Sequence, residues 1–105
     1  MFRTAACRAG ELLLLLIFLV PLTVQGQSIK VTLLGTGSPT PAMDRFGPSV
    51  LVEAGAQKFL FDAGRGALQR LAQIKVQWRD VQGTFLTHLH SDHLVGIPDL
   101  WLAQL

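Results

Sequence analysis

Residues 83–93 read Gly-Thr-Phe-Leu-Thr-His-Leu-His-Ser-Asp-His, and this stretch holds all three histidines of the chain. Its first five residues predict a short strand. Because side chains alternate along a strand, His88 and His90 are expected to leave its end on the same side. Two imidazoles on one side can bind a single metal ion. Asp92 and His93 follow as the chain turns, and they offer an oxygen and a nitrogen to the same ion or to a neighbouring one.

This cluster of side chains is best interpreted as a metal site. Imidazole and carboxylate ligands suit zinc, and they also suit manganese or iron. The alternative is a polar surface loop with chance histidines, which would explain a lone histidine better than three of them beside an aspartate. Four neighbouring residues cannot complete the shells of two metal ions, so further ligands must come from elsewhere.

The rest of the chain predicts short strands and helices around this loop. Residues 29–33 alternate apolar and polar side chains, which is the pattern of a half-buried strand. Two further short runs with strand-forming residues are separated by a glycine-containing turn and predict a hairpin. The predicted elements are strands at 29–33, 49–53, 58–61 and 83–87, a loop at 35–41, a helix at 66–74, a connector at 78–81 and a second helix from Pro98 to the last residue.

The first 26 residues are typical of a secretory signal peptide. Two arginines precede an apolar run at residues 12–24, and a small residue, Gly26, closes the segment. The run is shorter than the roughly 20 apolar residues of a membrane span. We therefore expect cleavage near Gln27 and a secreted or periplasmic protein, with residues 27–105 as its mature part. An uncleaved segment would instead anchor the protein in a membrane.

Charge and composition exclude several classes of protein. Residues 27–105 carry seven Lys or Arg and six Asp or Glu, a net charge of +1, so the strong basic signature of many nucleic-acid binders is missing. Half of all residues are apolar, which argues against a disordered chain. The single cysteine, Cys7, excludes an internal disulfide.

The motif and its surroundings resemble a known superfamily. Residues 88–93 match the His-x-His-x-Asp-His signature of the metallo-β-lactamase superfamily. Gly35-Thr36-Gly37-Ser38, Phe61-Asp62-Ala63-Gly64 and Leu86-Thr87-His88 are similar to the ribonuclease Z branch. The resemblance implies the α/β fold class, as an αββα sandwich with a dinuclear metal site at its edge. The residues that carry the resemblance are expected to form only the N-terminal part of such a sandwich, with one face of its sheet uncovered.

The resemblance also implies roles for the four residues of the cluster. His88 and His90 would bind one ion, and Asp92 and His93 the other; zinc is the expected metal, with manganese or iron as alternatives. A metal-bound hydroxide would attack the substrate, and Asp92 would be the catalytic proton acceptor. Asp62 is a candidate to orient a ligand histidine, or else a simple turn residue.

The function implied is that of an exported metal-dependent hydrolase that cleaves a phosphodiester, of the endoribonuclease or tRNA 3′-processing type. Its substrate would be a small molecule or RNA-like. An arylsulfatase-type or other ester hydrolase of the same fold is the alternative, as is a non-catalytic half-domain. The 105-residue chain alone is expected to be inactive. The sequence is compatible with a homodimer. Trp78 and Trp101 are expected to lie in the core. One departure is Arg65, where ribonuclease Z usually has a glutamate.

Overall fold

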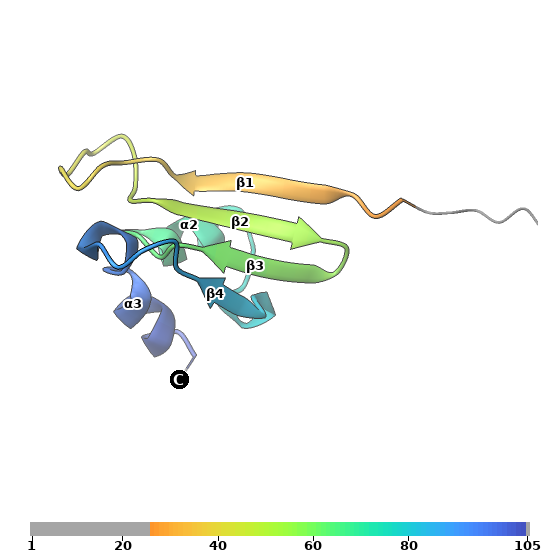
Figure 1. Cartoon of the computed structure of the whole chain (residues 1–105). Helices are drawn as coiled ribbons and strands as arrows, with labels where there is room; N and C mark the ends of the chain where they lie inside the picture. The colour runs from red at the N-terminus through yellow and green to blue at the C-terminus, as the bar shows by residue number, and fades with distance from the viewer. Residues whose placement is uncertain (1–25, 105) are drawn as a thin grey trace, which may run out of the picture.

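A single mixed sheet forms the centre of the protein (Figure 1). The computed structural model describes residues 26–104, and the expected signal peptide lies outside this range except for its last residue. The strands run in the order β1-β2-β3-β4; their bounds are Ile29–Gly35, Ser49–Ala54, Gln57–Phe61 and Gly83–Phe85. The first three strands are antiparallel, whereas β4 is parallel to β3. Within residues 26–104 no helix has the length and apolar character needed to cross a membrane.

The hairpin between β2 and β3 confirms the prediction from the sequence. Ala54 pairs with Gln57, so the turn consists of Gly55 and Ala56. The φ of Gly55 is 60°, whereas the φ of Ala56 is not positive. Glycine at the first central position is the requirement of a type II′ turn, whose twist matches that of paired strands.

The helices follow the predicted order with shorter bounds. The helix α2 (Ala67–Gln73) links the parallel strands β3 and β4 and is followed by a 3-10 turn, Trp78–Asp80, at the predicted connector. A second 3-10 turn, Ser91–His93, precedes the helix α3 (Ile97–Leu102). Pro98 lies in the first turn of α3, where its missing N–H costs no hydrogen bond. The predicted helix to the last residue is wrong in its extent, because α3 ends at Leu102.

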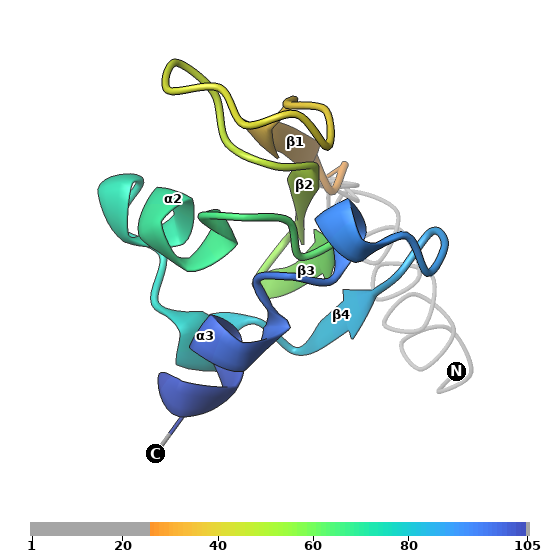
Figure 2. The same cartoon turned by 90° about the vertical axis from the view of Figure 1, so that its left-hand side faces the viewer.

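One face of the sheet packs on both helices (Figure 2). Leu51 of β2 and Leu60 of β3 are fully buried, and Leu71 of α2 packs against them. The other core members are Leu34, Ala63 and Leu100, with Leu68, Val76, Trp78 and Val81 packed at the edge. Trp78 therefore lies against the core as predicted. Trp101 does not, because 70% of it is exposed.

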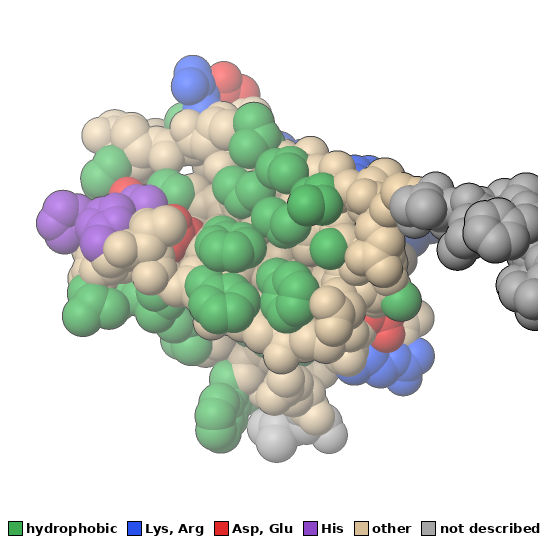
Figure 3. Space-filling model, turned by 45° about the vertical axis from the view of Figure 1, so that its right-hand side comes forward, with side chains coloured by type: hydrophobic (Ala, Val, Ile, Leu, Met, Phe, Trp, Pro, Cys, Tyr) green, Lys and Arg blue, Asp and Glu red, His purple; other side chains and the backbone are tan. Residues whose placement is uncertain are grey.

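The opposite face of the sheet is apolar and open to solvent (Figure 3). Residues paired across neighbouring strands project from the same face, and they place aliphatic side chains of β1 and β2 beside phenylalanines of β3 and β4. The members of this face are Ile29, Val31, Leu33, Val50, Val52, Phe59, Phe61 and Phe85. Such a face is what one half of a two-sheet sandwich presents before its partner sheet covers it, as the sequence predicted.

Candidate metal centre

Asp62 organises the edge of the sheet where the histidines lie. It follows the last residue of β3 with a φ of 61°, a left-handed conformation that aspartate adopts more readily than most residues. Its N–H donates to the carbonyl of Phe85, which is the last residue of β4. Its carboxylate then accepts from the N–H of Thr87 at 2.8 Å. The predicted strand at 83–87 is therefore two residues too long, because a side chain replaces the next rung of the ladder.

The same carboxylate also contacts a predicted metal ligand. Oδ2 of Asp62 lies 2.8 Å from Nδ1 of His93, close enough for an ion pair though not aligned as a hydrogen bond. The N–H of Ala63 donates to the carbonyl of His93 at 2.8 Å, so backbone and side chain of His93 are both tied to the end of β3. A carboxylate on one ring nitrogen leaves the other nitrogen of the ring available to a metal ion. Asp62 thus has the position of an orienting residue.

The environment of Asp62 keeps its carboxyl ionised. Burial by itself raises the pKa of Asp62, but two effects together outweigh it: the hydrogen bonds that the Thr87 amide and hydroxyl donate, and the close contact with the His93 ring. The pKa of Asp62 consequently lies below its usual value. A carboxylate is an acceptor only, and it can serve several donors at once.

His88 and His90 come together as the sequence predicted. Nε2 of His88 lies 2.9 Å from Nδ1 of His90, and the two ring centroids are 4.5 Å apart. Two nitrogens bound to one zinc at 2.0–2.1 Å would lie roughly 3.3 Å apart at the tetrahedral angle. The pair therefore needs to open by only a few tenths of an ångström to share one ion. The chain is extended at His90, which gives the alternation of a strand beyond the end of β4.

Asp92 and His93 form the second pair. Nε2 of His93 lies 3.6 Å from Oδ2 of Asp92, and both side chains are largely buried. The His93 ring also packs against that of His88, with centroids 4.0 Å apart. The structure therefore brings all four predicted residues to one end of the sheet, where Figure 3 shows the histidines gathered beside the apolar face.

The donor set fits divalent metal ions but is incomplete in the described range. No three His, Cys, Asp or Glu side chains of residues 26–104 converge into a ready-made metal cluster. Each pair supplies two donors, whereas a structural or catalytic zinc site uses three or four protein ligands. The remaining donors must come from other parts of the protein or from water.

Close contacts between glycines fix this loop against the end of β3. A Cβ on Gly96 would lie 2.4 Å from the carbonyl oxygen of Gly64, and a Cβ on Gly64 would lie 2.5 Å from the carbonyl carbon of Gly47. The N–H of Gly96 donates to the carbonyl of Ala63 at 2.8 Å. The turn that carries His93 is therefore pressed onto the Asp62 turn with no space for a side chain between them.

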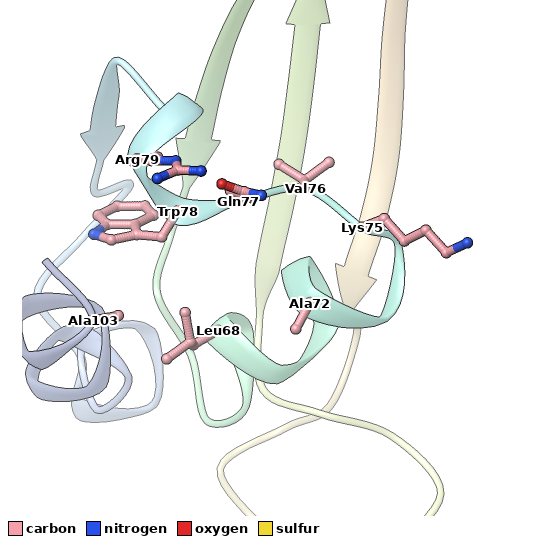
Figure 4. Close-up of a pocket in the computed structure, with 8 residues that line it drawn as sticks. All are labelled: Leu68, Ala72, Lys75, Val76, Gln77, Trp78, Arg79 and Ala103. Carbon is pink, nitrogen blue, oxygen red and sulfur yellow. The ribbon is translucent and has the colours of Figure 1, made fainter.

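A surface hollow lies beside one of the helices, away from the histidines. It has a volume of about 440 Å³ beside α2 and the 3-10 turn that follows it (Figure 4). Its lining residues are Leu68, Ala72, Lys75, Val76, Gln77, Trp78, Arg79 and Ala103. It contains no carboxylate, imidazole or thiol, so its lining offers none of the usual side-chain ligands of a metal ion.

Sequence reasoning missed Thr87 and Gly96. Thr87 was assigned to the end of a strand and to a stretch that resembles the ribonuclease Z branch, but nothing in its neighbours indicates that its hydroxyl contacts Asp62, 25 positions earlier. For Gly96 the one available signal was that a glycine follows the last histidine by three residues. This signal alone does not predict its backbone contacts with Ala63 and Gly64.

Replacing Asp62 with asparagine tests its role in stability. Asparagine tolerates the positive φ. It lacks, however, the negative charge that contacts with Thr87 and His93 stabilise in Asp62. Because the pKa of Asp62 is lowered in the folded state, its ionised form stabilises the fold above about pH 4, and this contribution disappears as the pH falls through the folded-state value. Thermal unfolding of the metal-free full chain should show a deficit of about 1–3 kcal/mol at pH 7 that shrinks toward pH 3.

Exposed Asp80 provides the matched control. Asp80→Asn should leave the unfolding temperature nearly unchanged across the same pH range. A deficit for Asp62→Asn that is equally large at pH 7 and pH 3 would contradict this role for the charge.

Comparisons with known proteins agree with this geometry. Residues 29–105 match the family model described as anti-Pycsar protein Apyc1. Ribonuclease Z of Mycobacterium bovis (strain BCG / Pasteur 1173P2) is 56% identical over 76 residues, which cover 72% of this chain and 27% of that protein. The chain thus spans about a quarter of the length of this curated relative.

Solved structures show the same fold. The metallo-β-lactamase fold protein YhfI from Bacillus subtilis superposes with a TM-score of 0.69 at 28% identity, over 74% of this chain and 32% of that one. The short form of human tRNase Z gives a TM-score of 0.64 at 34% identity, over 70% and 28% of the two chains. The described residues are part of a metallo-β-lactamase fold, as predicted.

The chain belongs to the anti-Pycsar protein Apyc1 family and is a ribonuclease Z-like member of the metallo-β-lactamase superfamily.

Proposed function

We propose that the protein is a metal-dependent hydrolase that cleaves phosphodiester bonds. The observation that carries this proposal is the convergence of His88, His90, Asp92 and His93 at one end of the sheet, with ring nitrogens of two histidines 2.9 Å apart. Relatives named ribonuclease Z and tRNase Z support a phosphodiester substrate class. The small net charge of residues 27–105 favours a short substrate over one held along a long basic surface.

In this mechanism His88 and His90 would hold one divalent ion, and Asp92 and His93 would hold the other. Zinc is the proposed metal, with manganese or iron as alternatives. When bound, such ions would supply Lewis acidity and would favour deprotonation of water near neutral pH. Asp62 holds the His93 ring through Nδ1 and so directs its Nε2 toward the Asp92 side of the site. Asp92 accepts the proton that the attacking water releases.

A panel of substrates tests the proposed reaction. The full-length protein, loaded with zinc, should hydrolyse bis(p-nitrophenyl) phosphate or a short RNA, and it should leave p-nitrophenyl sulfate intact. Hydrolysis of the sulfate ester alone would overturn the phosphodiester proposal in favour of an arylsulfatase-type enzyme. Absence of hydrolysis with two zinc ions bound would favour a non-catalytic protein.

We propose further that the protein is exported. The support is the arginine-containing start, the apolar run at residues 12–24 and the small residue before Gln27. Mass spectrometry of the exported protein should find a first residue near Gln27. An intact Met1 on protein extracted from membranes would contradict cleavage and indicate an anchor.

A further inference from the structure

The hydroxyl of Thr87 lies between a buried carboxylate and a predicted metal ligand. Its Oγ1 is 2.8 Å from Oδ2 of Asp62 and 3.0 Å from Oδ1. On its other side the same oxygen lies 3.0 Å from Nδ1 of His88. Asp62, Thr87 and His88 therefore form a continuous chain of polar contacts that ends at the metal centre.

The direction of the protons in this chain follows from the chemistry of its members. An ionised carboxylate can only accept a hydrogen bond, so the Thr87 hydroxyl must donate to Asp62. The hydroxyl has one proton, and its remaining lone pairs can only accept. Nδ1 of His88 must therefore carry a hydrogen and donate it to Thr87. The reverse arrangement would place a lone pair of the hydroxyl against the carboxylate.

The tautomer of His88 has a direct consequence for metal binding. With the hydrogen on Nδ1, Nε2 keeps its lone pair, and this is the nitrogen that lies 2.9 Å from Nδ1 of His90. A metal ion requires an unprotonated ring nitrogen. The contacts of Thr87 thus prepare the correct nitrogen before any metal arrives.

We propose that Thr87 is a positioning residue, which relays the orientation of Asp62 to His88 and fixes His88 in its metal-binding tautomer. The inference rests on the proposed function only in taking this cluster as a metal centre. One carboxylate then orients a ligand from each pair: it contacts His93 directly and reaches His88 through the hydroxyl. The two metal sites are therefore coupled through Asp62.

The test compares Thr87→Val with Thr87→Ser in the full chain. Valine has nearly the same shape as threonine but lacks the hydroxyl, whereas serine keeps it. Nitrogen NMR of the metal-free proteins, with His88 assigned from a His88→Gln variant, reports which ring nitrogen carries the hydrogen. The Nδ1–H form should dominate for His88 in the parent and in Thr87→Ser, and it should be lost in Thr87→Val.

Zinc affinity provides the second measurement. Zn²⁺ alone is the probe, and its affinity is measured by competition with a chelator. The site formed by His88 and His90 should bind Zn²⁺ about 10–100-fold more weakly in Thr87→Val and with near-parent affinity in Thr87→Ser. An Nε2–H form of His88 in the parent, or an unchanged tautomer and affinity in Thr87→Val, would overturn the relay. The parent tautomer decides the question even where Thr87→Val does not fold. A protein with the expected tautomer and zinc affinity that hydrolyses no phosphodiester would overturn the proposed function and leave the relay intact.

Discussion

Alanine at His88 or at His90 should mainly empty one metal site, whereas alanine at His93 should mainly empty the other. The reason is the pairing in the structure: His88 contacts His90 through ring nitrogens, and His93 contacts Asp92. Changes to residues that only orient a ligand cost about 10–100-fold in metal affinity or activity, so loss of a ligand itself should cost at least that much. Metal counting by mass spectrometry on each purified variant measures the effect.

Asp92→Ala should have the largest effect on activity, because it removes both a ligand and the proposed proton acceptor. Leu89→Ala is the matched control. Leu89 lies between the two histidines and is 77% exposed, so its loss changes the loop without removing a donor. That variant should keep its metal and its activity. If the variants at His88, His90, Asp92 and His93 all kept two metals and full hydrolysis, the assignment of this loop as the metal centre would be wrong.

Gly96→Ala should both weaken metal binding at the site of Asp92 and His93 and destabilise the fold. The backbone of Gly96 is right-handed helical, so alanine brings no torsional strain. Its Cβ, however, would lie 2.4 Å from the carbonyl oxygen of Gly64 and 2.9 Å from that of Ala63. Two backbone atoms cannot move aside as a flexible side chain can. We expect a loss of about 2–3 kcal/mol in the free energy of unfolding, toward the upper end for overpacked sites.

The shift of the backbone that the new methyl group causes should move His93 more than His88. The turn that ends at Gly96 carries His93, whose carbonyl accepts from the Ala63 N–H, whereas His88 lies nearer to β4. Competition with a chelator should thus show a larger loss of zinc affinity at the site of Asp92 and His93 than at the site of His88 and His90. Gly83→Ala is the control, since its nearest neighbour would be 3.7 Å away. Equal unfolding temperatures for Gly96→Ala and Gly83→Ala would contradict the close backbone contact.

The local pattern of the sequence predicted the strands and the hairpin because these depend on neighbouring residues. Alternation at residues 29–33 and the glycine at position 55 act within a few positions of themselves. The grouping of the three histidines was equally visible. The division of the four cluster residues into the pair His88 and His90 and the pair Asp92 and His93 was implied by the resemblance, and it stays a prediction.

Features set by distant contacts could not be predicted in the same way. The end of β4 depends on Asp62, which lies more than 20 positions earlier and takes the place of the next strand residue. From the sequence, Asp62 could equally be a turn residue or an orienting residue, and the structure shows that it occupies a turn and contacts His93. Trp101 was expected in the core, but the packing of α3 leaves it 70% exposed, at the rim of a hollow that Trp78 and Leu86 also line.

The metal content of the purified full-length protein tests the central claim most directly. The account predicts two divalent ions per chain, removal of both by a chelator together with phosphodiester hydrolysis, and recovery of hydrolysis when zinc is added back. A chain that holds no metal after purification and after zinc addition, or one whose hydrolysis survives complete removal of metal, would contradict it.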